Sequence, residues 1–131
     1  MNGGAALISI TSSGSFDKTE SFLKRVQKLD IPGVLESCGQ LGVNALSHAT
    51  PIETGLAAQS WGFQVSASRG VYEIAWTNTD TENGFPVVIM LQYGHGTGTG
   101  GYVAGRDFIN PTIRPIFDQI AERVWRVVSN A

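Results

Sequence analysis

The stretch Ala49-Thr50-Pro51-Ile52-Glu53-Thr54-Gly55-Leu56 decides how this chain divides between helix and sheet. A long helical pattern precedes it, and an alternating, strand-like pattern follows it. Because a proline disfavours the α conformation in the residue before it, the helix is predicted to end at Thr50. A threonine and a glycine then supply a turn. The predicted structural junction between helix and sheet consists of Thr50, Pro51, Thr54, Gly55 and Leu56.

Upstream of the junction, residues 31–49 carry the clearest periodic signal in the sequence. Apolar residues stay on one helical face throughout, Asp30 is the predicted N-cap, and Pro32 occupies the tolerated first turn. The small residues on this face are predicted to let another backbone approach closely; they are Gly39, Gly42 and Ala45. A shorter helix, with apolar positions up to Leu29, is predicted to be capped by Ser15 or by Asp17, and Asp17 and Glu20 are arranged like a capping box.

Downstream of the junction, two alternating runs around Ser68-Arg69-Gly70 predict a β-hairpin. Its aromatic and aliphatic side chains are predicted to share one face; they are Trp61, Phe63, Val65, Ala67, Tyr72, Ile74 and Trp76. A polar loop is predicted from Asn78 to Gly84. The continuous apolar run from Phe85 to Tyr93 predicts a third strand that is covered on both faces.

The last helix is predicted to begin with Asn110 as N-cap and Pro111 in the first position. Its apolar stripe consists of Ile113, Ile116, Phe117, Ile120, Val124, Val127 and Val128. The order of elements predicts an α+β fold: N-terminal helices including one long helix, a three-stranded, mainly antiparallel sheet with a hairpin, and a C-terminal helix packed on the sheet. Residues 1–14 are predicted to be a flexible arm with one possible strand around Ala5 to Ile10, and residues 15–131 a single domain.

The overall composition argues against several classes of function. Only 15% of the 131 residues are charged, against about 25% in typical soluble domains, which suggests surface hidden in an oligomer. The net charge is −2 and there is no basic run of the kind that binds nucleic acid without sequence preference. The single cysteine excludes an intrachain disulfide. No apolar stretch is long enough to span a membrane, and Met1 to Leu7 do not resemble a secretory signal.

Chemical interpretations of individual residues are weaker than structural ones. The glycine-rich loop Gly94–Gly101 invites a phosphate-binding interpretation, but no Gly-Lys-Ser/Thr closes it and no helix follows directly. A flexible hairpin or interface loop is favoured. His95 has no recognisable catalytic partner, and Cys38 lies on an apolar helix face, where a buried and inert thiol is expected. No cofactor and no metal site are predicted.

Two arginines and three aromatic residues also allow two interpretations each. Arg106 and Arg114 flank the start of the last helix, where surface solvation and contact with an acidic patch on a neighbour are equally expected. Trp61, Tyr72 and Trp76 are expected in the core, since a stacking platform for nucleic acid would have more lysine or arginine around it.

Three segments together resemble the small tail-component family of tailed bacteriophages. Thr50-Pro51-Ile52-Glu53-Thr54-Gly55-Leu56, followed by Ser60, is similar to the family's Thr-Pro-x-x-Thr-Gly-x-Leu-x-x-Ser stretch. Leu91-Gln92-Tyr93-Gly94 resembles a later Glu-Tyr-Gly segment, with Gln92 in place of the usual acid. Arg106-Asp107-Phe108-Ile109-Asn110-Pro111 resembles an Arg-Pro-Phe-Leu-x-Pro segment before the last helix, with Asp107 in place of the proline. The resemblance covers about residues 15–128.

This resemblance implies a non-enzymatic structural protein of the virion that is made in the host cytoplasm. It implies a homo-oligomeric ring at the head–tail interface, of six subunits or alternatively twelve, which joins head and tail or completes the tail. Its neighbours would be a neck or connector protein and a tail terminator or tail tube protein, and genomic DNA would pass the lumen without specific binding. The alternatives are a tail terminator that caps the tail tube and a small ligand-binding domain that uses Gly94–Gly101. The expected subunit contacts are Tyr93, Gly94, His95, Gly98, Gly101, Tyr102, Arg106 and Phe108.

Overall fold

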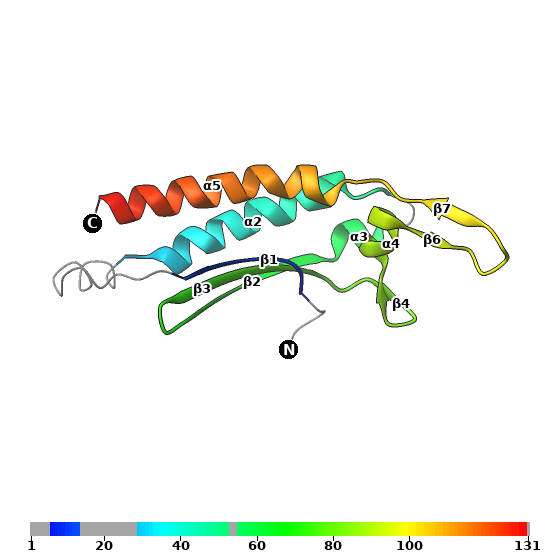
Figure 1. Cartoon of the computed structure of the whole chain (residues 1–131), viewed down its shortest axis with the longest axis horizontal. Coiled ribbons are helices and arrows are strands. Elements are labelled where there is room, and N and C mark those ends of the chain that lie inside the picture. The colour runs from blue at the N-terminus through cyan, green and yellow to red at the C-terminus, as the bar shows by residue number, and fades with distance from the viewer. Residues whose placement is uncertain (1–5, 14–28, 53–54, 131) are drawn as a thin grey trace.

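The computed structural model describes residues 6–13, 29–52 and 55–130, and it has the predicted α+β architecture (Figure 1). The shorter helix predicted before Leu29 falls on residues 14–28, which lie outside the described residues. The described elements, in chain order, are β1 (Ala6–Ser13), α2 (Ile31–Ala49), α3 (Leu56–Gln59), β2 (Trp61–Ser68), β3 (Val71–Asn78), β4 (Thr81–Glu82), β5 (Phe85–Pro86), α4 (Val87–Tyr93), β6 (Gly94–Gly96), β7 (Tyr102–Ala104) and α5 (Ile109–Ser129).

The main sheet has three antiparallel strands in the order β1-β3-β2. The predicted hairpin of β2 and β3 is confirmed, and it turns through Arg69 and Gly70, which both have positive φ angles of 53° and 78°. Such a two-residue turn matches the twist of the flanking strands. The possible N-terminal strand is also confirmed, and it pairs along β3. Residues 6–13 of the predicted flexible arm are therefore part of the main sheet.

The prediction of a third strand between Phe85 and Tyr93 was wrong. Only Phe85 and Pro86 are extended, and Val87–Tyr93 form α4. Pro86 stands at the N-cap position, where its missing N–H costs nothing. Val88 and Gln92 are buried four residues apart, which is helical spacing. A short run that is apolar throughout carries no period, so it does not distinguish a buried strand from a helix.

Helix α2 covers one face of the sheet and begins and ends as predicted. Asp30 caps it by accepting a hydrogen bond from the Gly33 N–H at 3.0 Å, and Thr50 is extended with ψ 127°. Gly39 and Gly42 are buried, but they accommodate aromatic rings of the sheet rather than another backbone. A methyl group added at either glycine would overlap the ring of Phe63 or of Trp76. The Trp76 Nε1–H also donates to the Gly39 carbonyl at 3.0 Å.

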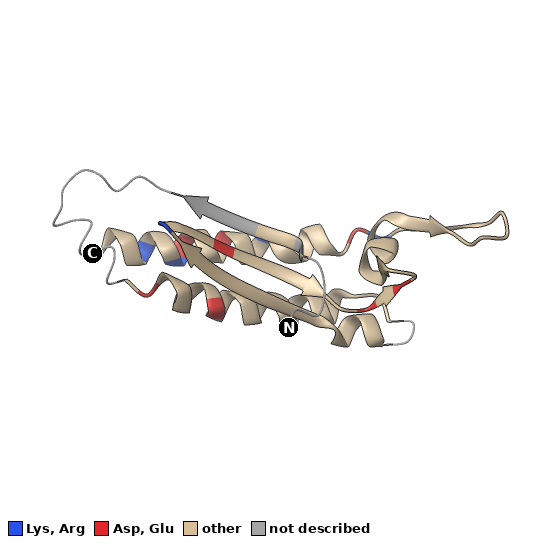
Figure 2. Cartoon of the chain, turned by 90° about the horizontal axis from the view of Figure 1, so that it is seen from below, with Lys and Arg blue, Asp and Glu red and all other residues tan. Residues whose placement is uncertain are grey.

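Helix α5 runs alongside α2 on the same side of the sheet, and no described helix or strand covers the opposite face, which we call the open face (Figures 1 and 2). It reaches the sheet through Phe117, whose ring lies 6.0 Å from that of Trp76, centroid to centroid. Its predicted apolar stripe is buried or half-buried. The prediction that Asn110 caps α5 was wrong: the helix already begins at Ile109, and the Asn110 amide donates to Asp107 at 3.1 Å instead.

Candidate functional site

The predicted helix-to-sheet junction is held by a pair of hydrogen bonds on one hydroxyl. Thr50 is only 2% exposed, and its Oγ1 donates to the Leu46 carbonyl at 2.6 Å and accepts from the Trp61 Nε1–H at 2.8 Å. The hydroxyl thus closes the last turn of α2 and fixes the first residue of β2. Gly55 has φ 82°, a conformation that favours glycine. Thr54 lies outside the described residues, Pro51 is half-buried, and Leu56 is exposed.

A second polar centre joins α4 to the start of α5. The Gln92 side chain is 6% exposed, and its Oε1 accepts from the backbone N–H groups of Phe108 and Ile109 at 3.0 and 2.9 Å. Its Nε2 donates to Asp107 Oδ1 at 2.7 Å. Gln92 therefore caps α5 from a distant part of the chain, in place of the predicted Asn110. The sequence signal for this role is that Gln92 is a single amide within the otherwise apolar run from Phe85 to Tyr93, and it was missed.

Between these two segments the chain forms a projecting hairpin of β6 and β7 (Figure 1). The predicted hairpin character of the glycine-rich loop is confirmed. Its base is closed by the Arg106 N–H, which donates to the Leu91 carbonyl at 2.9 Å, and by the Tyr102 hydroxyl, which donates to the Tyr93 carbonyl at 2.9 Å. Gly94 and Gly105 allow this close approach, since a methyl group on Gly94 would overlap the Val103 carbonyl and one on Gly105 would overlap the backbone at the end of α4.

The tip of this hairpin bonds to itself. The Thr97 N–H donates to the Gly101 carbonyl at 3.0 Å, and the Gly101 N–H donates to Thr97 Oγ1 at 3.1 Å. Gly98 and Gly100 take positive φ angles of 80° and 91°. Three residues of β7 and a further loop separate the tip from α5, so no long helix begins directly behind it. The arrangement of the tip is that of a closed turn.

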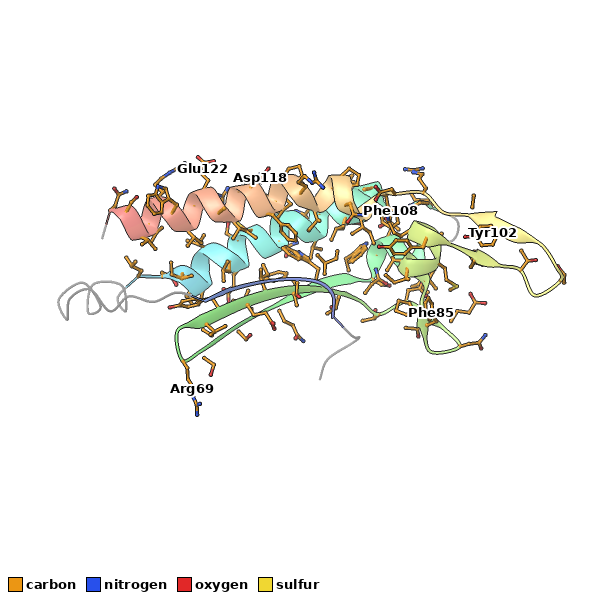
Figure 3. All side chains as sticks on the ribbon, viewed as in Figure 1. Arg69, Phe85, Tyr102, Phe108, Asp118 and Glu122 are labelled. Atoms are coloured by element: carbon orange, nitrogen blue, oxygen red, sulfur yellow. The ribbon has the colours of Figure 1, made fainter. Side chains whose placement is uncertain are left out.

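The expected subunit contacts divide into exposed and buried residues. Tyr93 and Tyr102 are 65% and 68% exposed, and Gly98, Gly101 and Arg106 are also exposed. Gly94 and His95 are half-buried. The prediction that Phe108 contacts a neighbouring subunit was wrong. Phe108 is only 3% exposed, and it belongs to the core at the N-terminus of α5. Figure 3 shows Tyr102 on the hairpin and Phe108 within the body.

Beside the junction lies a pocket of about 310 Å³ between α3, the β4–β5 turn and α4. Its walls combine apolar side chains with two carboxylates; the lining residues are Pro51, Gly55, Leu56, Ala57, Asp80, Thr81, Glu82, Val87 and Leu91. The polar loop predicted from Asn78 to Gly84 needs one correction. Asn78 is 1% exposed, and its Nδ2 donates to the Ala57 carbonyl at 2.8 Å, so it is a core residue that shapes this region.

The described residues contain little reactive chemistry. Within residues 6–13, 29–52 and 55–130, no cluster of three or more His, Cys, Asp or Glu side chains could hold a metal ion. Burial raises the pKa of the Cys38 thiol, against the opposing charge of Arg123, so the thiolate is disfavoured. Cys38 is fully buried, as predicted. Trp61 and Trp76 are also buried, as predicted for core residues.

Comparison with known proteins adds no relative: no family model, no curated protein and no solved structure matches this chain. Among the described helices, none has the length and apolar character that crossing a membrane requires.

Proposed function

We propose that this chain is a structural protein of a tailed-bacteriophage virion, without enzymatic activity, that forms a ring at the head–tail interface. In this role it joins head and tail or completes the tail, and it is made in the host cytoplasm before assembly. The ring has six subunits, or twelve in the alternative arrangement. It sits between a neck or connector protein and a tail terminator or tail tube protein, and genomic DNA passes through it.

One observation carries this proposal beyond the sequence resemblance. The chain departs from the family pattern at Gln92, where the family has an acid, and at Asp107, where it has a proline. These two side chains are hydrogen-bonded to each other at 2.7 Å. An acid at position 92 would place two carboxylates side by side, so the two departures compensate each other. Paired changes at contacting positions are expected when a chain retains the family's architecture with altered details.

The roles of the other matched residues support the same proposal. Thr50 and Gly55 lie where helix passes into sheet, and they make structural contacts rather than lining a reactive site. The exposed tyrosines at the base of the β6–β7 hairpin, Tyr93 at the end of α4 and Tyr102 in β7, offer contact surface, since aromatic residues are enriched in the centres of interfaces. Projection of a hairpin from the body suits a head-to-tail contact, and repeated head-to-tail contacts close into rings.

The charge distribution is compatible with a channel that DNA passes without sticking. On the open face of the sheet, the described side chains of β2 and β3 include no lysine or arginine, and Figure 2 shows that face largely free of charge. Arg69 lies at the very end of the β2–β3 turn and points away from the body (Figure 3). A lumen lined by this face would bind phosphate weakly, because affinity for the DNA backbone depends on cationic contacts.

The decisive experiment is electron microscopy of a lysate from the parent phage with this gene interrupted. Filled heads beside free tails of normal length would establish head–tail joining. Overlong tails would establish the alternative of a tail terminator. Intact and infectious particles would contradict both roles.

Intact particles would also restore the small ligand-binding domain built on Gly94–Gly101. That alternative predicts a rise in Tm with a phosphate-containing ligand, whereas an assembly hairpin shows no such stabilisation. The self-bonded tip of the hairpin favours the assembly role.

A further inference from the structure

We propose that neighbouring subunits of the ring are joined edge to edge through the main sheet, with strand β2 of one copy pairing in parallel with strand β1 of the next. This inference rests on the proposed ring and specifies how its subunits contact one another. It concerns the two outer strands of the sheet, which no described strand covers on the outside.

Within the part of the chain that the structure describes, no strand pairs with the outer side of β1 or of β2. β1 and β2 are each eight residues long, and neither contains a charged residue or a proline. Natural proteins protect exposed sheet edges with lysines, prolines, bulges or short strands, because unpaired N–H and C=O groups attract another strand. β2 has none of these devices, and β1 has one register shift, between Ala6 and Ile8. Two long unprotected edges on one small domain indicate that both are used.

The geometry of the hairpin determines which residues of β2 bond to β3 and which point their backbone N–H and C=O groups outward. A two-residue turn places a hydrogen-bonded pair next to it, here Ser68 and Val71, and such pairs alternate along the strands. The bond from the Thr79 N–H to the Ser60 carbonyl, at 3.2 Å, has the same phase. The even-numbered residues of β2 therefore bond to β3, and the odd-numbered residues point their N–H and C=O groups outward. The outward residues are Trp61, Phe63, Val65 and Ala67.

The same alternation carries across β3 to the other edge. The even-numbered residues of β3 point towards β1, where Trp76 is paired with Ile8. The backbone N–H and C=O groups of Ile8 therefore point towards β3. The backbone groups that point away from β3, and so outward, are those of Ser9, Thr11 and Ser13. The outward residues of β2 have side chains on the helix side, whereas Ser9, an outward residue of β1, has its side chain on the open side. In a parallel pair, each outward residue of one strand bonds to the two residues that flank the one opposite it. The outward residues of the two strands must therefore carry their side chains on opposite faces of the sheet, as Ser9 and the outward residues of β2 do here.

Pairing in this phase continues both faces of the sheet from one copy to the next. Phe63, Val65 and Ile8 are all half-buried at the edges on the helix side, and the pairing brings these apolar side chains together. A two-fold pairing of β2 with a second β2 is also allowed by the backbone, but it leaves both β1 edges open. The head-to-tail arrangement uses both edges of every copy through a single repeated contact, and such a contact closes into a ring of identically oriented subunits.

The geometry of a closed ring agrees with a channel. Six copies of a three-stranded sheet supply 18 strands. At ~4.8 Å between neighbouring strands, they close at a diameter of roughly 28 Å, before strand tilt widens it. With the helices outside, the open face of the sheet, whose described side chains in β2 and β3 include no lysine or arginine and one carboxylate, Glu73, lines this channel.

The test removes one outward N–H without disturbing the inner ladder. Ala67 is exposed, and its N–H points outward, so Ala67→Pro is tolerated by the hairpin as proline is on other edge strands. Ala67→Ser keeps the N–H and is the matched control. In native mass spectrometry and sedimentation of the full chain, the wild type and Ala67→Ser are expected to form the ring. Ala67→Pro is expected to weaken each interface by roughly tenfold, the effect of one lost hydrogen bond, with an unchanged monomer Tm.

A cross-linking experiment tests the direction of pairing independently of that proline. Ser9→Cys is combined in turn with Gly62→Cys, Gln64→Cys and Ser66→Cys, all on the open face. Head-to-tail pairing predicts that one of these double variants forms a disulfide ladder up to the full ring. The wild-type chain is the control, because Cys38 is fully buried.

Three outcomes overturn the edge pairing. A β2–β2 contact would give dimers, and nothing larger, from Ser66→Cys or Gln64→Cys alone. A ring that resists Ala67→Pro and yields no ladder would place the contact elsewhere but leave the proposed neck function standing. A chain that stays monomeric at all concentrations would exclude self-pairing, and the lysate microscopy would then decide the function separately.

Discussion

The Gln92 amide donates a 2.7 Å hydrogen bond to the Asp107 carboxylate while its oxygen caps the first N–H groups of α5. One buried side chain thereby satisfies two backbone donors and orients the carboxylate that precedes them. Uncapped helix N-termini leave such donors unpaired, so this contact determines where α5 begins. Because α5 packs along α2, the position of the second helical layer depends on it.

Replacement of Gln92 by glutamate tests this relationship. Gln92→Glu keeps an acceptor for α5 but places a carboxylate against Asp107, and we expect a loss of about 2 kcal/mol of unfolding free energy at neutral pH. Adding Asp107→Ala should restore most of this loss, because the repulsion is removed. Urea denaturation of the two single variants and the double variant measures the coupling. Additive losses would show that the two side chains do not interact.

The junction hydroxyl provides a second prediction. Thr50→Val keeps the shape of the side chain but removes the acceptor for the buried Trp61 Nε1–H and the donor to the Leu46 carbonyl. A buried donor without a partner costs about 1–3 kcal/mol, so we expect a destabilisation in that range. Thr50→Ser retains the hydroxyl and is expected to lose less. A larger loss in Thr50→Ser than in Thr50→Val would mean that the methyl group, and not the hydroxyl, fixes the junction.

For Gly42→Ala, tertiary packing and helix propensity predict stability changes of opposite sign. Alanine favours a helix by about 1 kcal/mol over glycine, so Gly42→Ala would stabilise an isolated α2. In the folded chain the new methyl group overlaps the indole of Trp76, and we expect a net destabilisation of about 1–3 kcal/mol. Glu36→Ala, on the exposed side of the same helix, is the control and should change stability little. Thermal unfolding followed by circular dichroism would reveal a wrong prediction as a raised Tm for Gly42→Ala.

The exposed tyrosine of the hairpin should matter for assembly. Tyr102→Ala removes a 68% exposed ring, so we expect a loss of neck assembly in phage complementation. Tyr102→Phe loses only the hydroxyl bond to the Tyr93 carbonyl and should still assemble. The two purified monomers should have similar Tm values. Full complementation by Tyr102→Ala would remove this residue from the contact surface.

Burial of Cys38 predicts protection from alkylation. Its pKa is raised by desolvation, so the reactive thiolate is depleted at neutral pH and is regained only as the pH rises towards that raised pKa. We expect negligible labelling by iodoacetamide in the native state at pH 7 and complete labelling in urea. Rapid native labelling at pH 7 would require that α2 separates from α5 in solution.

Sequence patterns predicted those elements whose determinants are local. α2 has its cap at Asp30, its stop at Pro51 and its apolar face between them, and the β2–β3 hairpin has its turn at Arg69-Gly70. α4 was missed because a seven-residue apolar run has no readable period.

Long-range contacts account for the remaining errors. The cap of α5 comes from Gln92, 17 residues before Ile109, and its geometry is set only after folding. Phe108 was assigned to the surface because its burial depends on that same cap. In the candidate site, the exposed hairpin residues were predictable from the glycine-rich composition, whereas the bonds that close its base were not.

The closed base of the β6–β7 hairpin makes this segment a replaceable module. The Arg106–Leu91 and Tyr102–Tyr93 hydrogen bonds hold the two ends of the hairpin together, so the packing of the rest of the domain does not depend on the length or sequence of the tip. Doubling the length of such an excursion costs only about 0.6 kcal/mol in loop-closure entropy. Lineages can therefore lengthen, shorten or exchange the tip to match a new neighbour without redesigning the hydrophobic interior. Divergence is expected to concentrate at residues 97–100, while the residues that close the base change slowly.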